Sequence, residues 1–346
     1  MEKEKFNSPA HLLKPPPLSV SSNYEELELS RLGEGVFGTV SRFLKKDTSQ
    51  IVAVKRLKDE SCFDAKKEIS ILERLRSFGA HKCHIVQFHE HFQKDGHTCL
   101  VFEALDISLY DYMRQRDFVP LSLYDIRWII KQLAVAFDTL KTMGLIHTDV
   151  KPDNIMLVDH EKKPLRVKLI DFGLAIPTCE AEQGAHLQPK YWRSPEILLG
   201  LQFSEAIDMW SLGCVMAEML LGYPLFPGRC EYDVMRFIVQ LLGPPPEHLL
   251  NAGLRTKRFF KKPFFSFRRH WRLMTPVEYR GVDAPDRETR RYDFRSLVQL
   301  KEARSTPPPQ HQASATQDEA RNCREQEQVN SPLTLRKLLN VPERHI

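Results

Sequence analysis

Two short motifs in the middle of the chain constrain its fold and chemistry more than any other feature. The first is His147–Asn154 (HTDVKPDN), and the second, Asp171–Gly173 (DFG), begins 22 residues after Asp149. Phosphoryl transfer requires a carboxylate that orients a hydroxyl group, a cation beside it and two metal-binding side chains on neighbouring loops. The order and separation of the two motifs therefore predict a phosphoryl-transfer site.

Each residue type in these motifs suits one task in that chemistry. We expect Asp149 to accept or orient the proton of the attacking hydroxyl group, and Lys151 to screen the charge on the moving phosphoryl group. Asn154 and Asp171 supply the oxygen ligands that Mg2+ prefers, and such a site keeps waters and shares ligands with nucleotide phosphates. We interpret Asp153 as a loop carboxylate rather than a third metal ligand.

Two further residues are predicted to support the same loop. His147 has the chemistry of a general base, but we interpret it as a structural residue packed beneath the loop with Phe172. Asp208 opens an apolar helix, where it is expected to hold the loop backbone by hydrogen bonds. A simple helix cap is the alternative for Asp208, and the two roles are compatible.

A glycine-rich stretch, Gly33–Val40 (GEGVFGTV), lies near the start of the chain. Glycines let the backbone approach a triphosphate closely, so that amide groups can face its oxygens. A dinucleotide-binding loop is the alternative, but a helix follows that loop directly, whereas a strand-like run, 39–43, follows this one. The pattern therefore favours the nucleotide loop of protein kinases. The residues expected to contact the nucleotide are Gly33, Gly35, Gly38 and Val40.

Lys55 lies 17 residues after Gly38 and ends the apolar run that begins at Val52. A lysine on a buried strand costs free energy unless its charge meets phosphates and a carboxylate. Glu68, on an amphipathic helical stretch, is the candidate carboxylate, through the Lys–Glu pair that kinases use. A surface lysine is the alternative for Lys55. Ala53, in the same run, is assigned to the nucleotide site.

The run Leu100–Leu105 is expected to form a hinge between two lobes. The backbone at Glu103 and Leu105 would then hydrogen-bond adenine, Phe102 would guard a deeper pocket, and Met156 would lie under the base. Each of these residues is equally plausible as an ordinary core residue.

The periodicity along the chain predicts an α+β fold with two lobes. Short β-rich runs dominate residues 24–102, with the last two strands expected over 85–92 and 97–102. Helices dominate from residue 106 onward, with the hinge at 103–105. The stretch 209–221 is apolar nearly all round and is expected to be central. Residues 24–301 are assigned to this domain. Residues 1–23 are interpreted as a disordered leader, 302–331 as a polar low-complexity segment and 332–346 as a final helix.

Composition excludes several other classes of protein. Seven scattered cysteines without a CxxC pair argue against a zinc site or a disulfide framework, and favour a reducing intracellular compartment. The first residues are charged and show no signal peptide, and no apolar run is long enough to span a membrane. A net charge of +5 decides little about partners.

Several strings go beyond a general kinase pattern. Lys190–Glu196 (KYWRSPE) resembles the substrate-docking segment of the CMGC kinase group, with Arg193 as its characteristic arginine. Five other stretches resemble, more specifically, the homeodomain-interacting protein kinase family: 97–103, 154–159, 206–214, 231–233 and 256–260. The resemblance runs from about Tyr24 to Val298.

The resemblance implies a serine/threonine kinase that uses ATP and Mg2+, with possible autophosphorylation on tyrosine. It implies protein substrates, among them transcription factors or co-regulators, and residence in the nucleus and possibly the cytoplasm. We expect a monomeric kinase domain, with no direct binding of nucleic acid and no membrane association.

The chain departs from the pattern of this family at several positions. His186 stands where relatives have an activation-loop tyrosine, so switching by phosphorylation at this position is unavailable. Pro189 replaces a usual serine, and His345 stands for the arginine that normally pairs with Glu196. Thr148 replaces the arginine of most kinases, although relatives in this family also carry a small residue there.

Two alternatives to an active kinase remain open at this stage. The altered activation loop and the damaged carboxy-terminal motif would also suit a catalytically weak or inactive scaffold that binds partners. Residues 254–272 interleave eight Lys or Arg residues with five Phe and one Trp, which would suit a nucleic-acid surface. We interpret that segment as an insert with packed aromatic rings and solvated basic groups.

Overall fold

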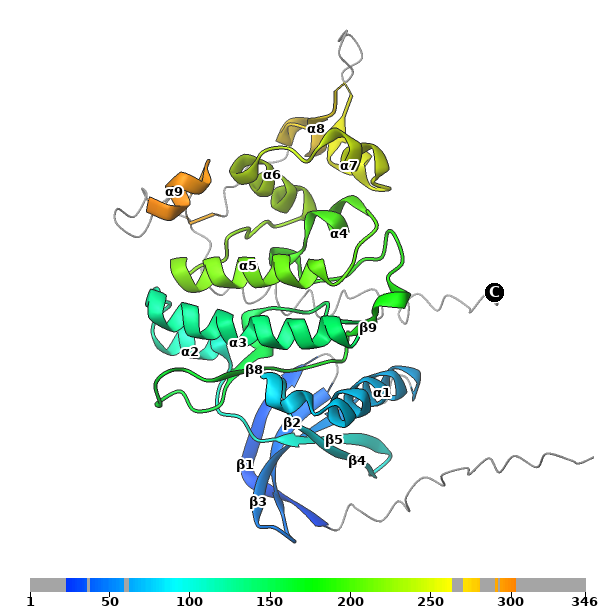
Figure 1. The fold of residues 1–346 in the computed structure, drawn as a ribbon, viewed down its shortest axis with the longest axis vertical. Coiled ribbons are helices and arrows are strands. Elements are labelled where there is room, and N and C mark those ends of the chain that lie inside the picture. Colours follow the sequence, from blue (N-terminus) through cyan, green and yellow to red (C-terminus); the bar gives the residue numbers. More distant parts are fainter. Residues whose placement is uncertain are drawn as a thin grey trace, which may run out of the picture.

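The α+β fold with two lobes that the sequence predicts is present in the computed structural model (Figure 1). The structure describes residues 23–35, 38–58, 62–262, 270–280, 290, 291 and 293–302. Figure 1 shows strands β1 to β5 together with helix α1 at one end of the molecule and the remaining helices at the other.

The smaller lobe is one antiparallel sheet with a helix beside it. The strand order is β1-β2-β3-β5-β4, and α1 contacts β4. Valine and phenylalanine recur in strands β2 to β5, as expected for a pleated surface with one covered face. The elements of this lobe are β1 (Tyr24–Gly35), β2 (Gly38–Lys45), β3 (Gln50–Leu57), α1 (Cys62–Phe78), η2 (Ala80–Cys83), β4 (Phe88–Lys94) and β5 (His97–Glu103).

The larger lobe is mainly helical, and short strand pairs lie near its border with the sheet. Its first part comprises α2 (Leu109–Gln115), α3 (Leu123–Thr142), β6 (Leu145–Ile146), η3 (Pro152–Asn154), β7 (Ile155–Leu157), β8 (Val167–Leu169), β9 (Ile176–Pro177) and η4 (Thr178–Glu180). Its second part comprises η5 (Lys190–Trp192), α4 (Pro195–Leu199), α5 (Ala206–Leu221), α6 (Glu231–Leu242), α7 (Glu247–Ala252), η6 (Thr256–Arg258), β10 (Phe260–Lys261), β11 (Arg272–Leu273), α8 (Pro276–Arg280) and α9 (Leu297–Glu302).

The register of the sheet brings the predicted nucleotide residues together. Val40 on β2 pairs with Lys55 on β3, and Ala53 on β3 pairs with Phe102 on β5. Gly38 faces the backbone of β3 so closely that a Cβ atom at this position would lie 2.0 Å from the carbonyl oxygen of Arg56. Glycine is therefore required at this position by packing, apart from any role toward phosphates.

Two details of the predicted elements are wrong. The strand expected over 85–92 begins only at Phe88, because Ile85 makes an isolated bridge to Leu169 in the other lobe. Helix α5 packs against α3, but it is not buried on all sides: Met209 is 49 % exposed and Met216 is 45 % exposed. These two residues lie seven positions apart and so share one face of the helix.

Several interpretations from the sequence concern residues that lie outside the described ones. They are those of residues 1–22, 303–331 and 332–346, of Val36 and Phe37, and of the missing partner of Glu196. Among the helices of the described part, none is both long and apolar enough to cross a membrane.

Candidate active site

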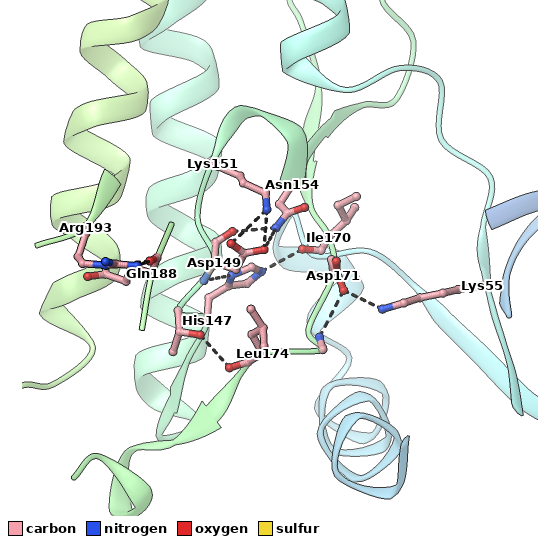
Figure 2. Close-up of polar contacts among 12 residues, drawn as sticks. Lys55, His147, Asp149, Lys151, Asn154, Ile170, Asp171, Leu174, Gln188 and Arg193 are labelled. Carbon is pink, nitrogen blue, oxygen red and sulfur yellow. Dashed lines mark hydrogen bonds and ion pairs between the residues drawn. The ribbon is translucent and has the colours of Figure 1, made fainter. Parts of the chain in front are cut away.

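The carboxylate of Asp149 lies at the centre of a tight polar cluster (Figure 2). The ammonium group of Lys151 is 3.0 Å from Oδ2 of Asp149, and the side-chain amide of Asn154 donates to the same oxygen at 2.7 Å. Burial lowers the pKa of Lys151, but Asp149, together with Asp153 and Asp171, outweighs this effect and raises it. Lys151 is therefore a fixed positive charge beside the Asp149 carboxylate.

The loop that carries Asp149 is held from below by a second carboxylate, as predicted. Oδ2 of Asp208 accepts from the amide of His147 at 2.7 Å, and Oδ1 accepts from the amide of Thr148 at 3.0 Å. Thr148 has a φ of 66°, an unfavourable conformation for a β-branched residue. Its hydroxyl group donates to the carbonyl of Leu174, which ties this loop to the segment after DFG.

The geometry of His147 supports the structural interpretation over that of a general base. The side chain is fully buried, and its ring contacts Phe172 edge to face, with the centroids 5.0 Å apart. Nε2 lies 2.9 Å from the carbonyl oxygen of Ile170, and Nδ1 accepts from the amide of Asp149. Both nitrogen atoms of the ring are thus used to hold backbone.

Lys55 joins the two lobes through two carboxylates. Its ammonium group is 2.8 Å from Glu68 on α1 and 2.8 Å from Asp171 after β8. Burial opposes the charge of Lys55, but Asp171 and Glu68 together raise its pKa. Against the effect of burial, Lys55 in turn lowers the pKa of Asp171 to about 2. Lys55 and Asp171 are therefore ionised at neutral pH, which is the state that phosphate and metal binding need.

The donor atoms of Asn154 and Asp171 fit a hard divalent cation. Within the part of the chain that the structure describes, Oδ1 of Asn154 and Oδ2 of Asp171 accept no hydrogen bond. Oxygen ligands of this kind suit Mg2+, which completes its coordination with water and phosphate oxygens. No group of three or more His, Cys, Asp or Glu residues among the described ones forms a self-sufficient metal site.

The hinge offers backbone groups where a base could bind. Leu105 is buried, and its amide and carbonyl make no hydrogen bond to any residue that the structure describes. The carboxylate of Glu103 points elsewhere: it lies 2.5 Å from Lys168 on β8 and accepts from the amide of Gln87. The sequence analysis did not anticipate Lys168, which fixes the hinge against the strand that leads to DFG.

A protein kinase domain model matches residues 27–246 of the chain. The chain belongs to the protein kinase family. Among similar curated proteins is mouse homeodomain-interacting protein kinase 1, which is 48 % identical over 282 residues, covering 81 % of this chain and 23 % of that protein. Homeodomain-interacting protein kinase 1 of Caenorhabditis elegans is 46 % identical over 284 residues, covering 79 % of this chain and 33 % of that protein.

Human homeodomain-interacting protein kinase 4 is 38 % identical over 284 residues, covering 80 % of this chain and 46 % of that protein. These relatives confirm the resemblance that the sequence motifs indicate. The kinase spans only about a quarter of the length of the first relatives that it matches.

We call residues 174–193, which follow DFG, the activation segment. Neutral and basic side chains attach it to the larger lobe. Arg193 donates from Nε to the carbonyls of Leu187 at 2.9 Å and Gln188 at 3.0 Å. Gln188 has a φ of 65°, and its side chain donates to Ile207 and Ser211. Figure 2 shows Arg193 and Gln188 on the side of Asp149 that is opposite to Lys55.

Three side chains make contacts at this segment that were not visible in the sequence. Gln183 donates to the carbonyl of Gly200 at 3.2 Å, and Gln202 donates to that of Ala181 at 3.1 Å. Arg255 donates to the carbonyls of Gly184 and Ile197. Single Gln and Arg residues carry no sequence signal for such long-range contacts, so only the fold reveals them.

His186 lies next to a carboxylate, but it is not paired as a cation. Its Nδ1 is 3.5 Å from Oε1 of Glu231, which is already 2.8 Å from Arg193. Burial and the nearby Arg193 lower the pKa of His186 to about 4. The imidazole is therefore neutral at physiological pH.

We expect this histidine to make the kinase less stable in mild acid. The unfolded chain takes up a proton near pH 6.5, whereas the folded chain resists it until about pH 4, so stability is full above pH 6.5 and falls as the pH drops. Because the side chain is 36 % exposed, the loss between pH 7.5 and 5 is only about 1 kcal/mol.

Urea unfolding of the wild type and of His186→Gln at both pH values measures this contribution. The Gln variant should lose about 1 kcal/mol less than the wild type between the two pH values. Equal losses in the two proteins would show that His186 is not the group that titrates.

The basic and aromatic segment supports the interpretation of a packed insert. Phe259 and Phe260 are buried. Lys261 lies 2.6 Å from Glu278, Arg272 contacts the same carboxylate at 2.6 Å, and Lys262 lies 3.8 Å from Glu247. Neighbouring carboxylates thus balance the charges of Lys261, Lys262 and Arg272, and residues 263–269 lie outside the described part of the chain.

Proposed function

We propose that the chain is an ATP-dependent protein serine/threonine kinase that transfers the γ-phosphate of ATP to hydroxyl groups of proteins. The proposal is carried by one observation: Lys55, Asp149, Asn154 and Asp171 lie around one site between the lobes (Figure 2), where Lys55 and Asp171 are ionised. Membership of the protein kinase family agrees with this chemistry.

Each residue has one task in the proposed mechanism. Asp149 orients the acceptor hydroxyl group and takes its proton, and Lys151 offsets the negative charge that develops nearby. Lys55 holds the nucleotide phosphates while Glu68 keeps the lysine in position. Asn154 and Asp171 would hold Mg2+, which would supply positive charge against the nucleotide phosphates.

The nucleotide would lie between the sheet and the larger lobe. Gly33, Gly35, Gly38 and Val40 would cover its phosphates, and Ala53 and Met156 would face the adenine ring. Because the carboxylate of Glu103 is held by Lys168, only the backbone of Glu103 and Leu105 is assigned to hydrogen bonding with the base. The kinase domain is proposed to span residues 24–301.

The substrates are proposed from the relatives. The relatives are named for interaction with homeodomains, which are DNA-binding domains, so transcription factors and co-regulators are proposed as substrates here, with action in the nucleus and, as a second location, the cytoplasm. Arg193 is proposed to dock the substrate beside Gln188. A monomeric domain without direct nucleic-acid or membrane binding is part of the same proposal.

A kinase-fold scaffold is the second candidate, favoured by His186 in place of a phosphorylatable residue. Purified chain with Mg-ATP and a generic basic protein substrate separates the two candidates, with Asp149→Asn as the blank. We expect phosphate incorporation well above the blank, on serine and threonine rather than tyrosine of the added substrate. Incorporation no greater than that of the blank would favour the scaffold.

A further inference from the structure

A group of arginine side chains meets one carboxylate beside the activation segment. Nη1 of Arg193 lies 2.8 Å from Oε1 of Glu231, and Nη1 of Arg258 lies 3.0 Å from Oε2 of the same residue. Arg255 lies close enough to Glu231 and to His186 to affect the titration of the latter. We call Arg193, Arg255 and Arg258 the arginine cluster.

The arginine cluster carries more positive charge than its surroundings balance. Two guanidinium groups, those of Arg193 and Arg258, share the carboxylate of Glu231. Arg255 donates to the carbonyls of Ile197 and Gly184, and no carboxylate in the described part of the chain forms an ion pair with it. His186 stays neutral and adds no compensating charge of either sign.

The arginine cluster is both reachable and adjacent to the proposed docking segment. The side chain of Arg258 is 52 % exposed, so an incoming anion can contact it without rearrangement of the core. Arg193 contacts both the docking segment and the carboxylate of the cluster. It donates to the carbonyls of Leu187 and Gln188 through Nε and to Glu231 through Nη1. A peptide docked along residues 187–193 would therefore pass next to the excess charge.

We propose that the arginine cluster is a specificity site that binds an anionic side chain of the protein substrate, a few residues from the phosphorylated one. Aspartate, glutamate and phosphoserine share the required chemistry, since guanidinium groups form charge-assisted, often bidentate hydrogen bonds with carboxylates and phosphates. This proposal rests on the proposed kinase function and names the substrate class for that site.

The contribution expected from such a contact can be bounded. A hydrogen bond to a charged group is stronger than one between neutral groups when it is shielded from water, and it is weaker at a half-exposed site. An anionic residue at the right position should therefore raise kcat/KM about tenfold over a neutral peptide. The preference should shrink as salt is raised, because exposed charges are screened.

The experiment uses the full chain and a set of synthetic peptides. One aspartate is moved through each position from about four before to about four after a single acceptor serine, a span of roughly 13 Å on each side, in an otherwise neutral peptide. A second set carries phosphoserine in place of aspartate. Two readouts are taken for every peptide: kcat/KM for phosphorylation, and affinity by fluorescence anisotropy, which does not require turnover.

We expect one or two positions at which both anionic peptides are preferred by the wild type. In Arg258→Gln the ratio of anionic to neutral kcat/KM should fall severalfold, whereas Arg258→Lys, which keeps the charge, should retain most of it. Arg114→Gln is the matched control. Arg114 is 51 % exposed and pairs with Asp111, and both residues belong to helix α2 rather than to the arginine cluster. Thermal unfolding confirms that each variant is folded.

Equal affinities for anionic and neutral peptides at every position would overturn the specificity site, whether or not the chain transfers phosphate. So would a preference that Arg258→Gln retains in full. A chain that prefers anionic peptides in binding but phosphorylates none of them would keep the site and contradict the proposed kinase activity instead.

Discussion

Replacement of Asp149 by asparagine should lower kcat by about three orders of magnitude, within the range that a positioned acid or base contributes. The asparagine is nearly isosteric, so the loop should keep its shape, but it cannot accept a proton from the acceptor hydroxyl group. Its amide would also face the donors of Lys151 and Asn154, both of which now contact Oδ2. KM for ATP should change little, because Lys55 and Asp171 are untouched.

Steady-state phosphorylation of a serine peptide measures this effect, and nucleotide binding to the variant confirms that the site is intact. Asp153→Asn is the matched control: it removes a carboxylate from the same loop, four residues away, and should lower kcat far less. If both substitutions reduced kcat equally, the loss would reflect the charge of the loop and not proton transfer by Asp149.

Much of this site could be predicted from sequence because its residues lie close together along the chain. Asp149, Lys151 and Asn154 belong to one loop, so their spacing alone fixes which side chains can meet. Lys55 required one further inference, since a lysine on a buried strand needs carboxylate partners. The structure supplies both partners, Glu68 and Asp171, at 2.8 Å.

The contacts that sequence reasoning missed join residues that are far apart and chemically ordinary. Lys168 lies 65 positions from Glu103, and Arg255 lies 71 positions from Gly184. Lysine and arginine are common on protein surfaces, so neither residue stands out until the fold brings it to its partner. The exposed face of α5 was missed for a related reason: an apolar pattern predicts burial but does not show which neighbours cover each face.

The loop geometry also shows how the chain accommodates Thr148, a departure from the usual kinase sequence. Thr148 stands where most kinases have arginine, and its φ of 66° needs external support. Asp208 and the carbonyl of Leu174 give that support through the backbone and the hydroxyl group of Thr148. The catalytic loop is therefore held by contacts within the chain, made through the backbone and the hydroxyl group of Thr148.

Replacement of Asp208 by alanine should therefore be among the most destabilising single changes in the larger lobe. Asp208 is buried, and without its carboxylate the amides of His147 and Thr148 would lose their partners inside the protein. Each buried unpaired amide costs about 1–3 kcal/mol, so we expect a loss of about 2–5 kcal/mol, against a total of about 5–15 kcal/mol for a typical domain. Since the loop would relax, kcat should fall as well.

Asp208→Asn separates the hydrogen bonds from the charge. Burial raises the pKa of Asp208, so the negative charge itself is disfavoured, and asparagine should lose only one of the two hydrogen bonds. Urea unfolding should rank the free energies as wild type above Asn above Ala, with Glu161→Ala, at an exposed loop carboxylate, within about 0.5 kcal/mol of wild type. An Asn variant as unstable as the Ala variant would mean that the charge, and not the pair of hydrogen bonds, holds the catalytic loop.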